Sequence, residues 1–270
     1  MRMRIFDLGR NLGMWHKAIR KACSELTGGL IDLALPAVCA ACGTDDVAAE
    51  GLCTACNVKL LSLVSLPYCP RCGATIGPGI PIYQEGCSAC PNPLPRFARV
   101  ARLGPYADPL RAVVRELKYR RRNWLHHRLG RMLGKTVEAS SLENLDLVMP
   151  VPMHWRRRLA RSCDHARVLA GAVAKELNLP LGDELIRVRH TPPQVNLPRT
   201  RRIENVRGAF EVRRAAGLSG ANVLLIDDVT TTGATADEAA RTLLKAGISK
   251  VVLAVVAKTE PPTAYAAHWA

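Results

Sequence analysis

The sequence has 270 residues, of which 38 are Lys or Arg and 23 are Asp or Glu, so its formal net charge is +15. Hydrophobic residues make up 48 %, which is enough for a core and excludes a globally disordered chain. The longest apolar runs, such as 251–257, are far shorter than the ~18 residues of a membrane-spanning helix, so we expect no integral membrane association. The length suits one medium catalytic domain with a small accessory module.

The first 26 residues have an amphipathic pattern. Ile5, Leu8, Leu12 and Trp15 recur at helical spacing, with basic residues between them. The segment lacks the uninterrupted apolar core and the small-residue cleavage site of a secretory signal, so we expect a cytoplasmic protein. The favoured interpretation is a helix that packs its apolar stripe on the protein itself, and a helix lying on a membrane surface is the alternative.

Eight of the ten cysteines form four Cys-x-x-Cys pairs. In a reducing compartment this density indicates metal ligands rather than disulfides or a redox dithiol. Zinc binds four soft ligands in a tetrahedron, and such a closed site is structural because it leaves no open position for catalysis. We expect consecutive pairs to join, with Gly43 and Gly73 at positive φ in the turns, although interleaved pairing also fits the spacing. The predicted ligands are Cys39, Cys42, Cys53 and Cys56 for one zinc ion and Cys69, Cys72, Cys87 and Cys90 for the other.

Composition divides the chain into four zones. We expect a helical lead-in at 1–35, a zinc module at 36–95, an α/β domain at 96–260 and a loose tail at 261–270. Strand-like and helix-like segments alternate in the third zone, which predicts a parallel sheet flanked by helices. The expected strands are 99–103, 145–149, 185–188, 209–212, 223–226 and 250–257, and the expected helices are 109–119, 124–138, 161–177 and 236–245.

The segment 223–235 reads Val-Leu-Leu-Ile-Asp-Asp-Val-Thr-Thr-Thr-Gly-Ala-Thr. Its apolar start predicts a buried strand with Asp227 and Asp228 at the carboxyl end, where open α/β sheets bind ligands. Backbone N–H groups of 231–235 can converge on a phosphate at the start of a helix, and Gly233 allows a close approach. The carboxylates suit ribose hydroxyls or a magnesium ion. The segment is neither a Walker loop nor a Rossmann fingerprint, and an ordinary strand–turn–helix is the alternative.

This order of apolar strand, acidic pair and Thr-Thr-Gly-x-Thr resembles the motif with which type I phosphoribosyltransferases bind phosphoribosyl pyrophosphate (PRPP). With the cysteine pairs in front of it, the arrangement over roughly residues 30 to 258 resembles the ComF family. The other matching pieces are Leu117-Lys118-Tyr119, Pro150-Val151-Pro152, Gln194-x2-Leu197, Arg202-x2-Asn205-Val206 and Ala209-Phe210. The resemblance implies a double zinc ribbon before a type I phosphoribosyltransferase-like domain. It also implies a magnesium-dependent phosphoribosyl transfer from PRPP to an unknown acceptor, and a role in competence, the uptake of single-stranded DNA.

The resemblance and the motif together assign a PRPP site. Asp227 and Asp228 would hold the ribose, and the loop would hold the 5′-phosphate. Lys118 and Arg202, assigned through the family match, would neutralise the diphosphate together with magnesium, and backbone groups near Val151 would form the diphosphate loop. The expected catalytic residues are Asp227, Asp228, Lys118 and Arg202, and the expected PRPP contacts are Asp227, Asp228, Val229, Thr230, Thr231, Thr232, Gly233, Ala234, Thr235 and Val151.

One segment departs from the family pattern. Residues 161–166 read Arg-Ser-Cys-Asp-His-Ala, where the family often has Arg-Gly-Phe-Asn-Gln-Ala. Asp164 and His165 would either supply proton transfer or mark a helix start with an exposed side chain, and the sequence leaves both interpretations open.

Two other classes of function remain. The positive excess lies in 96–214, which holds 26 Lys and Arg against 11 Asp and Glu, and the runs 117–124 and 155–161 combine cations with aromatics as single-stranded DNA binders do. Alternatively, these arginines serve an anionic pocket or a solvated face while the tryptophans lie in the core. The third class is an interaction protein that docks competence proteins and uses PRPP only as a regulatory ligand.

Overall fold

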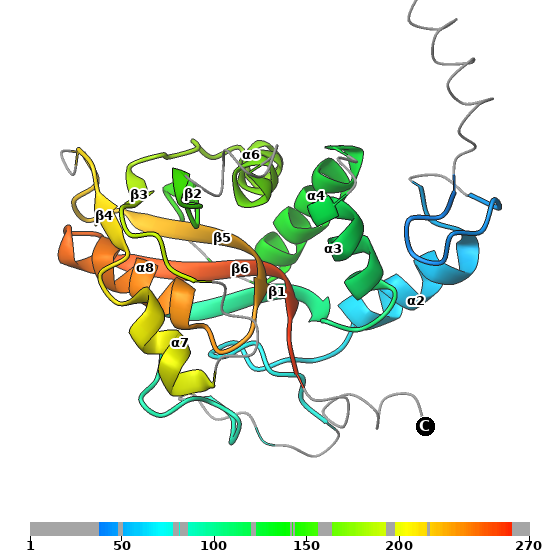
Figure 1. The fold of residues 1–270 in the computed structure, drawn as a ribbon, viewed down its shortest axis with the longest axis horizontal. Coiled ribbons are helices and arrows are strands. Elements are labelled where there is room, and N and C mark those ends of the chain that lie inside the picture. Colours follow the sequence, from blue (N-terminus) through cyan, green and yellow to red (C-terminus); the bar gives the residue numbers. More distant parts are fainter. Residues whose placement is uncertain are drawn as a thin grey trace, which may run out of the picture. The chain divides into compact units, whose positions relative to one another are not determined.

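The structure is a computed structural model that describes residues 38–47, 51–77, 81, 86–119, 123–140, 142, 144–155, 164–192, 198–214 and 217–260. It divides into two compact units, Met1–Thr54 and Ala55–Ala270, and each is described by itself (Figure 1). The expected lead-in helix and the expected tail lie outside the described residues. Among the helices described, none is both long enough and apolar enough to cross a membrane.

In the first unit, the described residues form a tight turn around cysteines. The N–H of Cys39 donates to Thr44 O at 2.8 Å, and the N–H of Gly43 donates back to Cys39 O at 2.9 Å. Gly43 has φ 80°, which confirms the positive φ expected for this turn. The N–H of Cys53 donates to Cys39 Sγ at 3.3 Å, so the turn points its sulfur atoms toward one another.

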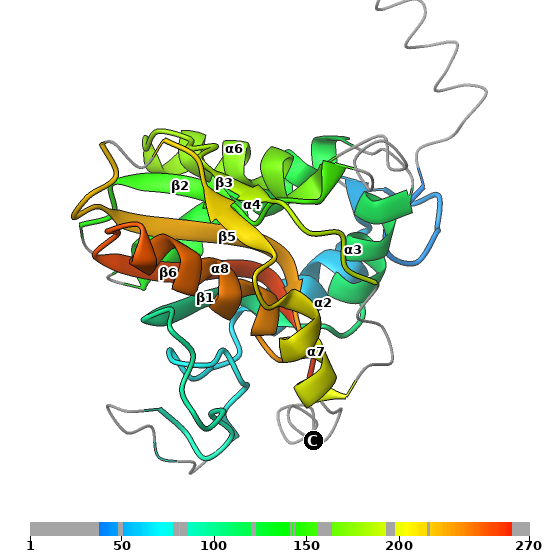
Figure 2. The ribbon, with the colours of Figure 1, turned by 60° about the vertical axis from the view of Figure 1, so that its left-hand side comes forward.

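In the described part of the second unit, four strands form one parallel sheet in the order β1-β6-β5-β2, as predicted (Figures 1 and 2). The strands are β1 (Arg99–Pro105), β6 (Lys250–Lys258), β5 (Asn222–Thr230) and β2 (Leu147–Pro150). Strand β5 is longer than the predicted 223–226, because its pairing with β6 continues to Thr230 opposite Lys258. Asp227 and Asp228 therefore lie inside β5, near its carboxyl end, and not after its last residue.

Helices cover both faces of this sheet. The helices that bear on the site are α3 (Leu110–Tyr119), α4 (Asn123–Ala139), α6 (His165–Leu177), α7 (Arg199–Val206) and α8 (Ala234–Lys245). Helix α6 begins four residues later than predicted because the Asp164 side chain caps it, accepting from the N–H of Arg167 at 3.3 Å. Helices α2 (Thr54–Val64) and α7 were not predicted, since one lies among the cysteine pairs and the other among arginines.

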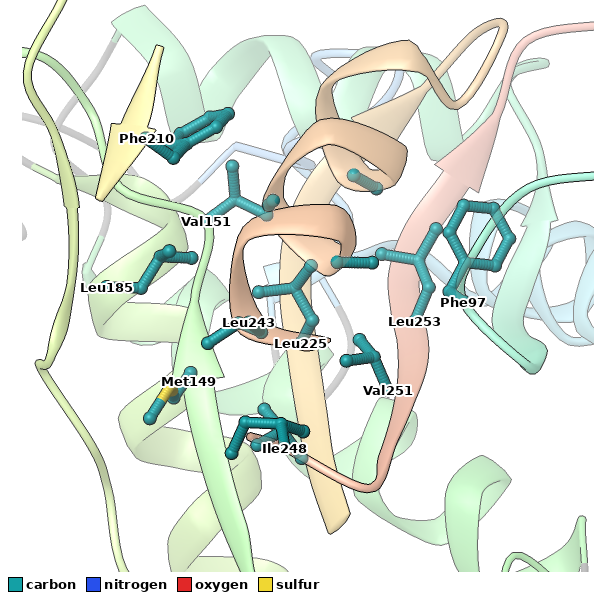
Figure 3. Packing of buried hydrophobic residues seen from close by; sticks show 14 of the residues in the cluster. Phe97, Met149, Val151, Leu185, Phe210, Leu225, Leu243, Ile248, Val251 and Leu253 are labelled. Carbon is teal, nitrogen blue, oxygen red and sulfur yellow. The ribbon is translucent and has the colours of Figure 1, made fainter. Parts of the chain in front are cut away.

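The core lies between the sheet and α8. Alternate residues of β5 and β6, including Leu225, Val251 and Leu253, point toward Leu243 of α8 (Figure 3). Their neighbours, such as Leu224, are equally buried and face the other way, where α4 and α6 pack on the sheet (Figure 2). This double burial explains why the strands read as unbroken apolar runs.

Two short strands stand apart from the main sheet. Strands β3 (Leu185–Arg187) and β4 (Phe210–Val212) were both expected, and they pair antiparallel with each other. Leu185 and Phe210 are buried in the same core cluster as Val151, just beyond β2 (Figure 3). The β3–β4 pair thus forms a wall beside the carboxyl end of the sheet.

Candidate functional site

A cavity of about 330 Å³ lies beyond the carboxyl ends of β2 and β5. Its lining combines a continuous segment, from the end of β5 to the start of α8, with side chains from α3, β3, α6 and α7. The lining residues are Lys118, Val151, Pro152, Met153, Asp164, His165, Ala166, Arg187, Arg202, Asp227, Asp228, Val229, Thr231 and Thr235. The cavity therefore brings together the four side chains that sequence analysis named as catalytic, although α3 and α7 are far from β5 in the chain.

The two acidic residues have different surroundings. The carboxylate of Asp227 accepts the N–H of Asp228 at 2.8 Å, and that of Asp228 accepts the N–H of Val229 at 2.6 Å. Burial raises the pKa of Asp227 to about 7, and the neighbouring carboxylate of Asp228 adds to this rise. Asp227 therefore titrates near neutral pH in the ligand-free protein.

Lys118, at the end of α3, pairs with the acidic motif. Its Nζ lies 2.8 Å from Asp228 Oδ2, and both side chains are about three-quarters buried. Burial lowers the pKa of Lys118, but the carboxylates of Asp228 and Asp227 outweigh burial and hold that pKa above its usual value. Lys118 is therefore a permanent cation inside the cavity.

The loop between β5 and α8 is built to face an anion. Gly233 caps α8 with φ 79° and offers no side chain, so the first N–H groups of the helix are not closed off by a cap from this residue. The hydroxyl of Thr231 accepts from Arg202 Nη1 at 2.6 Å, and Thr235, the second residue of α8, lines the cavity. Positive charge and helix dipole thus meet at one point.

The other expected contacts lie around this loop. Thr230 is buried at the end of β5, and Ala234 is the first residue of α8. Thr232 accepts the N–H of Ala234 at 3.4 Å and lines a smaller neighbouring cavity of about 160 Å³ together with Gly233. The loop therefore separates two cavities, and Thr231 borders both.

Val151 lines the larger cavity, but its backbone is already engaged. Its N–H donates to Ile226 O at 2.8 Å and so continues the pairing of β2 with β5 past Pro150. This N–H extends the sheet instead of facing an anion, and Pro152 has no N–H to donate. Residues 151–153 therefore contribute to the shape of the cavity, with Met153 as one of its lining side chains.

Arg187 of β3 is a lining cation that sequence reasoning missed. Its Nη2 donates to Thr191 Oγ1 at 2.5 Å, and its guanidinium carbon lies 5.4 Å from the centroid of the Phe210 ring. The position of Arg187 depends on the pairing of β3 with β4, two strands that are separated in the chain by α7. No local pattern around Arg187 could have indicated it.

Asp164 and His165, where the sequence departs from the family pattern, lie at the start of α6. Asp164 is the cap of α6, as one interpretation expected, but the His165 side chain is buried rather than exposed. His165 Nδ1 lies 3.0 Å from His126 Nε2, and the two rings stack at 5.3 Å between centroids. The pair holds His165 at the wall of the cavity, where the alternative role in proton transfer remains chemically open to it.

The two tryptophans of the basic runs are exposed. Trp124 is 39 % and Trp155 is 56 % exposed, which contradicts the interpretation that the tryptophans lie in the core. The neighbouring cations at 120–122 and 156–163 lie outside the described residues.

The eight paired cysteines form two groups, each with all its sulfur atoms within 4.8 Å of one another. The groups are Cys39, Cys42, Cys53, Cys56 and Cys69, Cys72, Cys87, Cys90, so the consecutive pairing is confirmed. Sulfur pairs such as Cys69 with Cys90 and Cys72 with Cys87 are 3.7 Å apart. Four sulfurs at ~2.3 Å from one tetrahedral zinc ion would be about 3.8 Å apart, whereas a disulfide needs ~2.05 Å. Both groups therefore fit zinc.

Two family descriptions match the chain. A double zinc ribbon domain matches residues 30–91, and a phosphoribosyl transferase domain matches residues 164–267. Among solved structures, a glutamine PRPP amidotransferase from B. subtilis aligns with 53 % of this chain and 30 % of its own, at 21 % identity and a TM-score of 0.36.

Curated relatives align over most of their length. Competence protein F of Haemophilus influenzae is 29 % identical over 215 residues, which are 77 % of this chain and 91 % of that protein. The DNA utilization protein YhgH of Salmonella typhi is 31 % identical over 215 residues, with the same shares of both chains. With a double zinc ribbon followed by a phosphoribosyltransferase-like domain, the chain belongs to the ComF family.

Proposed function

We propose that the chain binds PRPP with magnesium in the larger cavity and transfers its phosphoribosyl group to an acceptor. The observation that carries this proposal is the meeting of an acidic pair, a helix N-terminus and the cations Lys118 and Arg202 in one cavity. A phosphorylated, polyhydroxylated and highly anionic ligand needs these three features together. The two curated relatives are named for competence and for DNA utilization, and we propose that this chain acts in the same process, in the cytoplasm.

The groups of the chain divide the ligand between them. The N–H groups of 231–235 and the hydroxyls of Thr231 and Thr235 bind the 5′-phosphate, because they lie at the positive end of α8. Asp227 and Asp228 accept hydrogen bonds from the ribose hydroxyls and stabilise the positive charge that develops on the ribose as its bond to diphosphate breaks.

The leaving diphosphate needs positive charge on the other side of the ribose. Lys118 and Arg187 line the cavity and neutralise the oxygen atoms of the diphosphate, whereas Arg202, bonded to Thr231, adds positive charge at the 5′-phosphate. Magnesium, when bound with the ligand, supplies further neutralisation of the leaving group. The cysteine groups hold two structural zinc ions, and neither zinc takes part in the transfer.

Binding should depend on pH through Asp227. Its pKa is raised to about 7 in the ligand-free protein, and a carboxylate near ribose and magnesium must be ionised. Protons therefore compete with the ligand below pH 7, and we expect the affinity for Mg-PRPP to rise between pH 6 and pH 8. Asp227→Asn should remove most of this protein-dependent slope, leaving the titration of the phosphate groups of PRPP itself.

Calorimetric titration of the zinc-replete protein with Mg-PRPP tests the site. We expect the double variant Asp227→Asn with Asp228→Asn to lose binding by at least about a hundredfold, since two charge-assisted contacts are removed. Asp108→Asn, an exposed acid paired with Arg111 outside the cavity, is the matched control and should bind as the wild type does. Zinc content should be the same in all three proteins. Unchanged affinity in the double variant, or no binding to the wild type, would reject the proposal.

The second candidate is a single-stranded DNA-binding or partner-docking competence protein in which PRPP is a regulatory ligand. The exposure of Trp124 and Trp155 beside basic runs favours it, because exposed rings can stack on bases. This candidate predicts an affinity for oligothymidine that falls steeply with salt and drops in Trp155→Ala. It also predicts that bound PRPP is retained without turnover, which separates it from the transferase.

A further inference from the structure

The second cysteine group is hydrogen-bonded to β1 and to the residues that follow β6, the strand that pairs with β5 beside the phosphate loop. The N–H of Val100 in β1 donates to Pro70 O at 2.7 Å, within the turn that carries Cys69 and Cys72. The N–H of Thr75 donates to both oxygen atoms of Glu260, at 3.0 and 3.1 Å. These bonds fix the turn to β1 and to the residues that follow β6.

A buried ion pair supports this junction. Arg102 of β1 donates from Nη1 to Glu260 at 2.8 Å and from Nη2 to the hydroxyl of Thr75 at 2.6 Å. The side chains of Arg102 and Glu260 are 0 % and 3 % exposed. Because removing either partner would leave a buried charge, the junction holds the cysteine turn in one position against the sheet.

Lys258, the last residue of β6, crosses from the cysteine turn to the phosphate loop. Its Nζ donates to Thr231 O at 2.8 Å. Its aliphatic stem lies under Gly73, where an added Cβ would be only 3.2 Å from Lys258 Cδ. Cys72, Lys258 and the loop residues 230–233 line the same small cavity. The stem of Lys258 is therefore confined between the cysteine turn and the phosphate loop.

The hydrogen bond to Lys258 fixes the first peptide of the loop. The ladder between β5 and β6 ends at Thr230, so Thr231 O is beyond the regular strand pairing, and Lys258 takes the place of a backbone donor. In a trans peptide the C=O and the following N–H point in opposite directions. Holding Thr231 O toward Lys258 therefore turns the N–H of Thr232 away from Lys258.

We propose that Lys258 is a positioning residue for the phosphate loop, and that the second cysteine group, when it holds its metal, sets the order of that loop by confining Lys258. This inference rests on the proposed function only for its consequence, the affinity for PRPP. Its physical content concerns the loop itself and can be measured without a ligand. In this arrangement, loss of zinc from the second group disorders the turn, frees the stem of Lys258 and loosens the peptide after Thr231.

Amide hydrogen exchange of the zinc-replete full chain tests the role of Lys258. In Lys258→Met, we expect the amides of 231–235 to exchange roughly tenfold faster, because a hydrogen bond from a charged donor is lost. Lys258→Arg keeps a donor and should restore slow exchange. Lys245→Met, at the exposed end of α8, is the matched control and should leave the loop unchanged. Equal exchange in the wild type and Lys258→Met would overturn the proposal, as would equally faster exchange at 223–226, which would indicate a merely structural role.

A double-variant cycle tests the link to the cysteine group. Cys87→Ser removes one ligand of the second group and should speed exchange at 231–235 when Lys258 is present. If the link runs through Lys258, Cys87→Ser should have a much smaller effect on the loop in the Lys258→Met background. Fully additive effects would overturn the link.

Titration with Mg-PRPP separates this inference from the proposed function. We expect Lys258→Met to bind roughly tenfold more weakly than the wild type and Lys258→Arg to bind nearly as well. No binding to the wild type rejects the proposed function, and the exchange experiments still decide the inference. Binding to the wild type and equally to Lys258→Met leaves the proposed function standing and overturns the inference.

Discussion

The two cysteine groups have the same chemistry and different attachments. In the first group, the bonds around the Cys39–Gly43 turn are local, such as those from Cys39 to Thr44 and from Gly43 to Cys39, and Cys56 is on α2, whose Asn57 accepts from Arg128 of α4 at 2.5 Å. In the second group, the turn is bonded to β1 and to the end of β6 through Val100 and Glu260. Cys42 of the first group is exposed, whereas the corresponding Cys72 of the second is buried.

This difference indicates that the two zinc ions, although held by identical ligands, stabilise different parts of the molecule. A zinc ion that closes only a local loop stabilises that loop, because metal binding then orders only the few residues of the loop. A zinc ion whose turn is bonded into a sheet contributes to the stability of the sheet as well. The second group should therefore report on, and influence, the site beyond β5 and β6, and the first group should do so much less.

Loss of one zinc ligand should have the largest effect, and it should separate the two groups. We expect Cys87→Ser to lower the unfolding free energy of the second unit by at least about 3 kcal/mol, since structural zinc contributes ~10–16 kcal/mol in small zinc peptides. For a domain of this size, 3 kcal/mol corresponds to roughly 6–12 °C in Tm. Thermal unfolding followed by circular dichroism measures it.

The comparison variant is Cys42→Ser in the first group. It should lose one zinc ion per chain, as Cys87→Ser does, yet lower the main unfolding transition much less. Zinc content measured by a colorimetric chelator confirms that each variant has lost one ion. Equal destabilisation by the two variants would contradict the division between the groups.

Breaking the buried ion pair should have the next largest effect. Burial lowers the pKa of Arg102 and Glu260 opposes that shift, so Glu260→Gln leaves an uncompensated buried cation. We expect a loss of about 3 kcal/mol in the unfolding free energy, measured by urea denaturation.

The exposed pair of Arg111 and Asp108 provides the control for this variant. Both side chains are about half exposed, so Asp108→Asn should cost less than about 0.5 kcal/mol. If the buried pair is what ties the second cysteine group to the sheet, Glu260→Gln should also speed amide exchange across the turn at 69–75. A similar cost for both variants would show that the junction is not held by this pair.

The parts of the molecule that sequence analysis predicted are those with local patterns. Apolar runs predicted β5 and β6, because strands buried on both faces carry no polar interruption. The spacing of the cysteines predicted both groups, and the acidic pair before a Thr and Gly loop predicted one wall of the cavity. Lys118 and Arg202 were named mainly through the family resemblance, and they do line the same cavity.

The features that were missed depend on contacts between distant segments. Arg187 reaches the cavity only because β3 pairs with β4, and Lys258 reaches Thr231 only because β6 lies beside β5. The N–H of Val151 could not be known to pair with Ile226 before the strand order was known. The exposure of Trp155 likewise depends on how the segment that carries it packs against the core, which the local sequence does not determine.

The smallest effect we predict separates two glycines that precede or follow metal ligands. Gly86 has φ +126°, and a Cβ added there would lie 2.4 Å from Cys90 Sγ, whereas a Cβ at Gly43 (φ +80°) would meet nothing within 4 Å. Gly43→Ala should therefore cost only the strain of positive φ, about 1 kcal/mol, and weaken zinc binding about fivefold. Gly86→Ala adds the displacement of a ligand and should weaken zinc binding roughly thirtyfold or more. Competition with a chelator measures both, and equal weakening would mean that the second group tolerates movement of Cys90, so that it is no more rigidly built than the first.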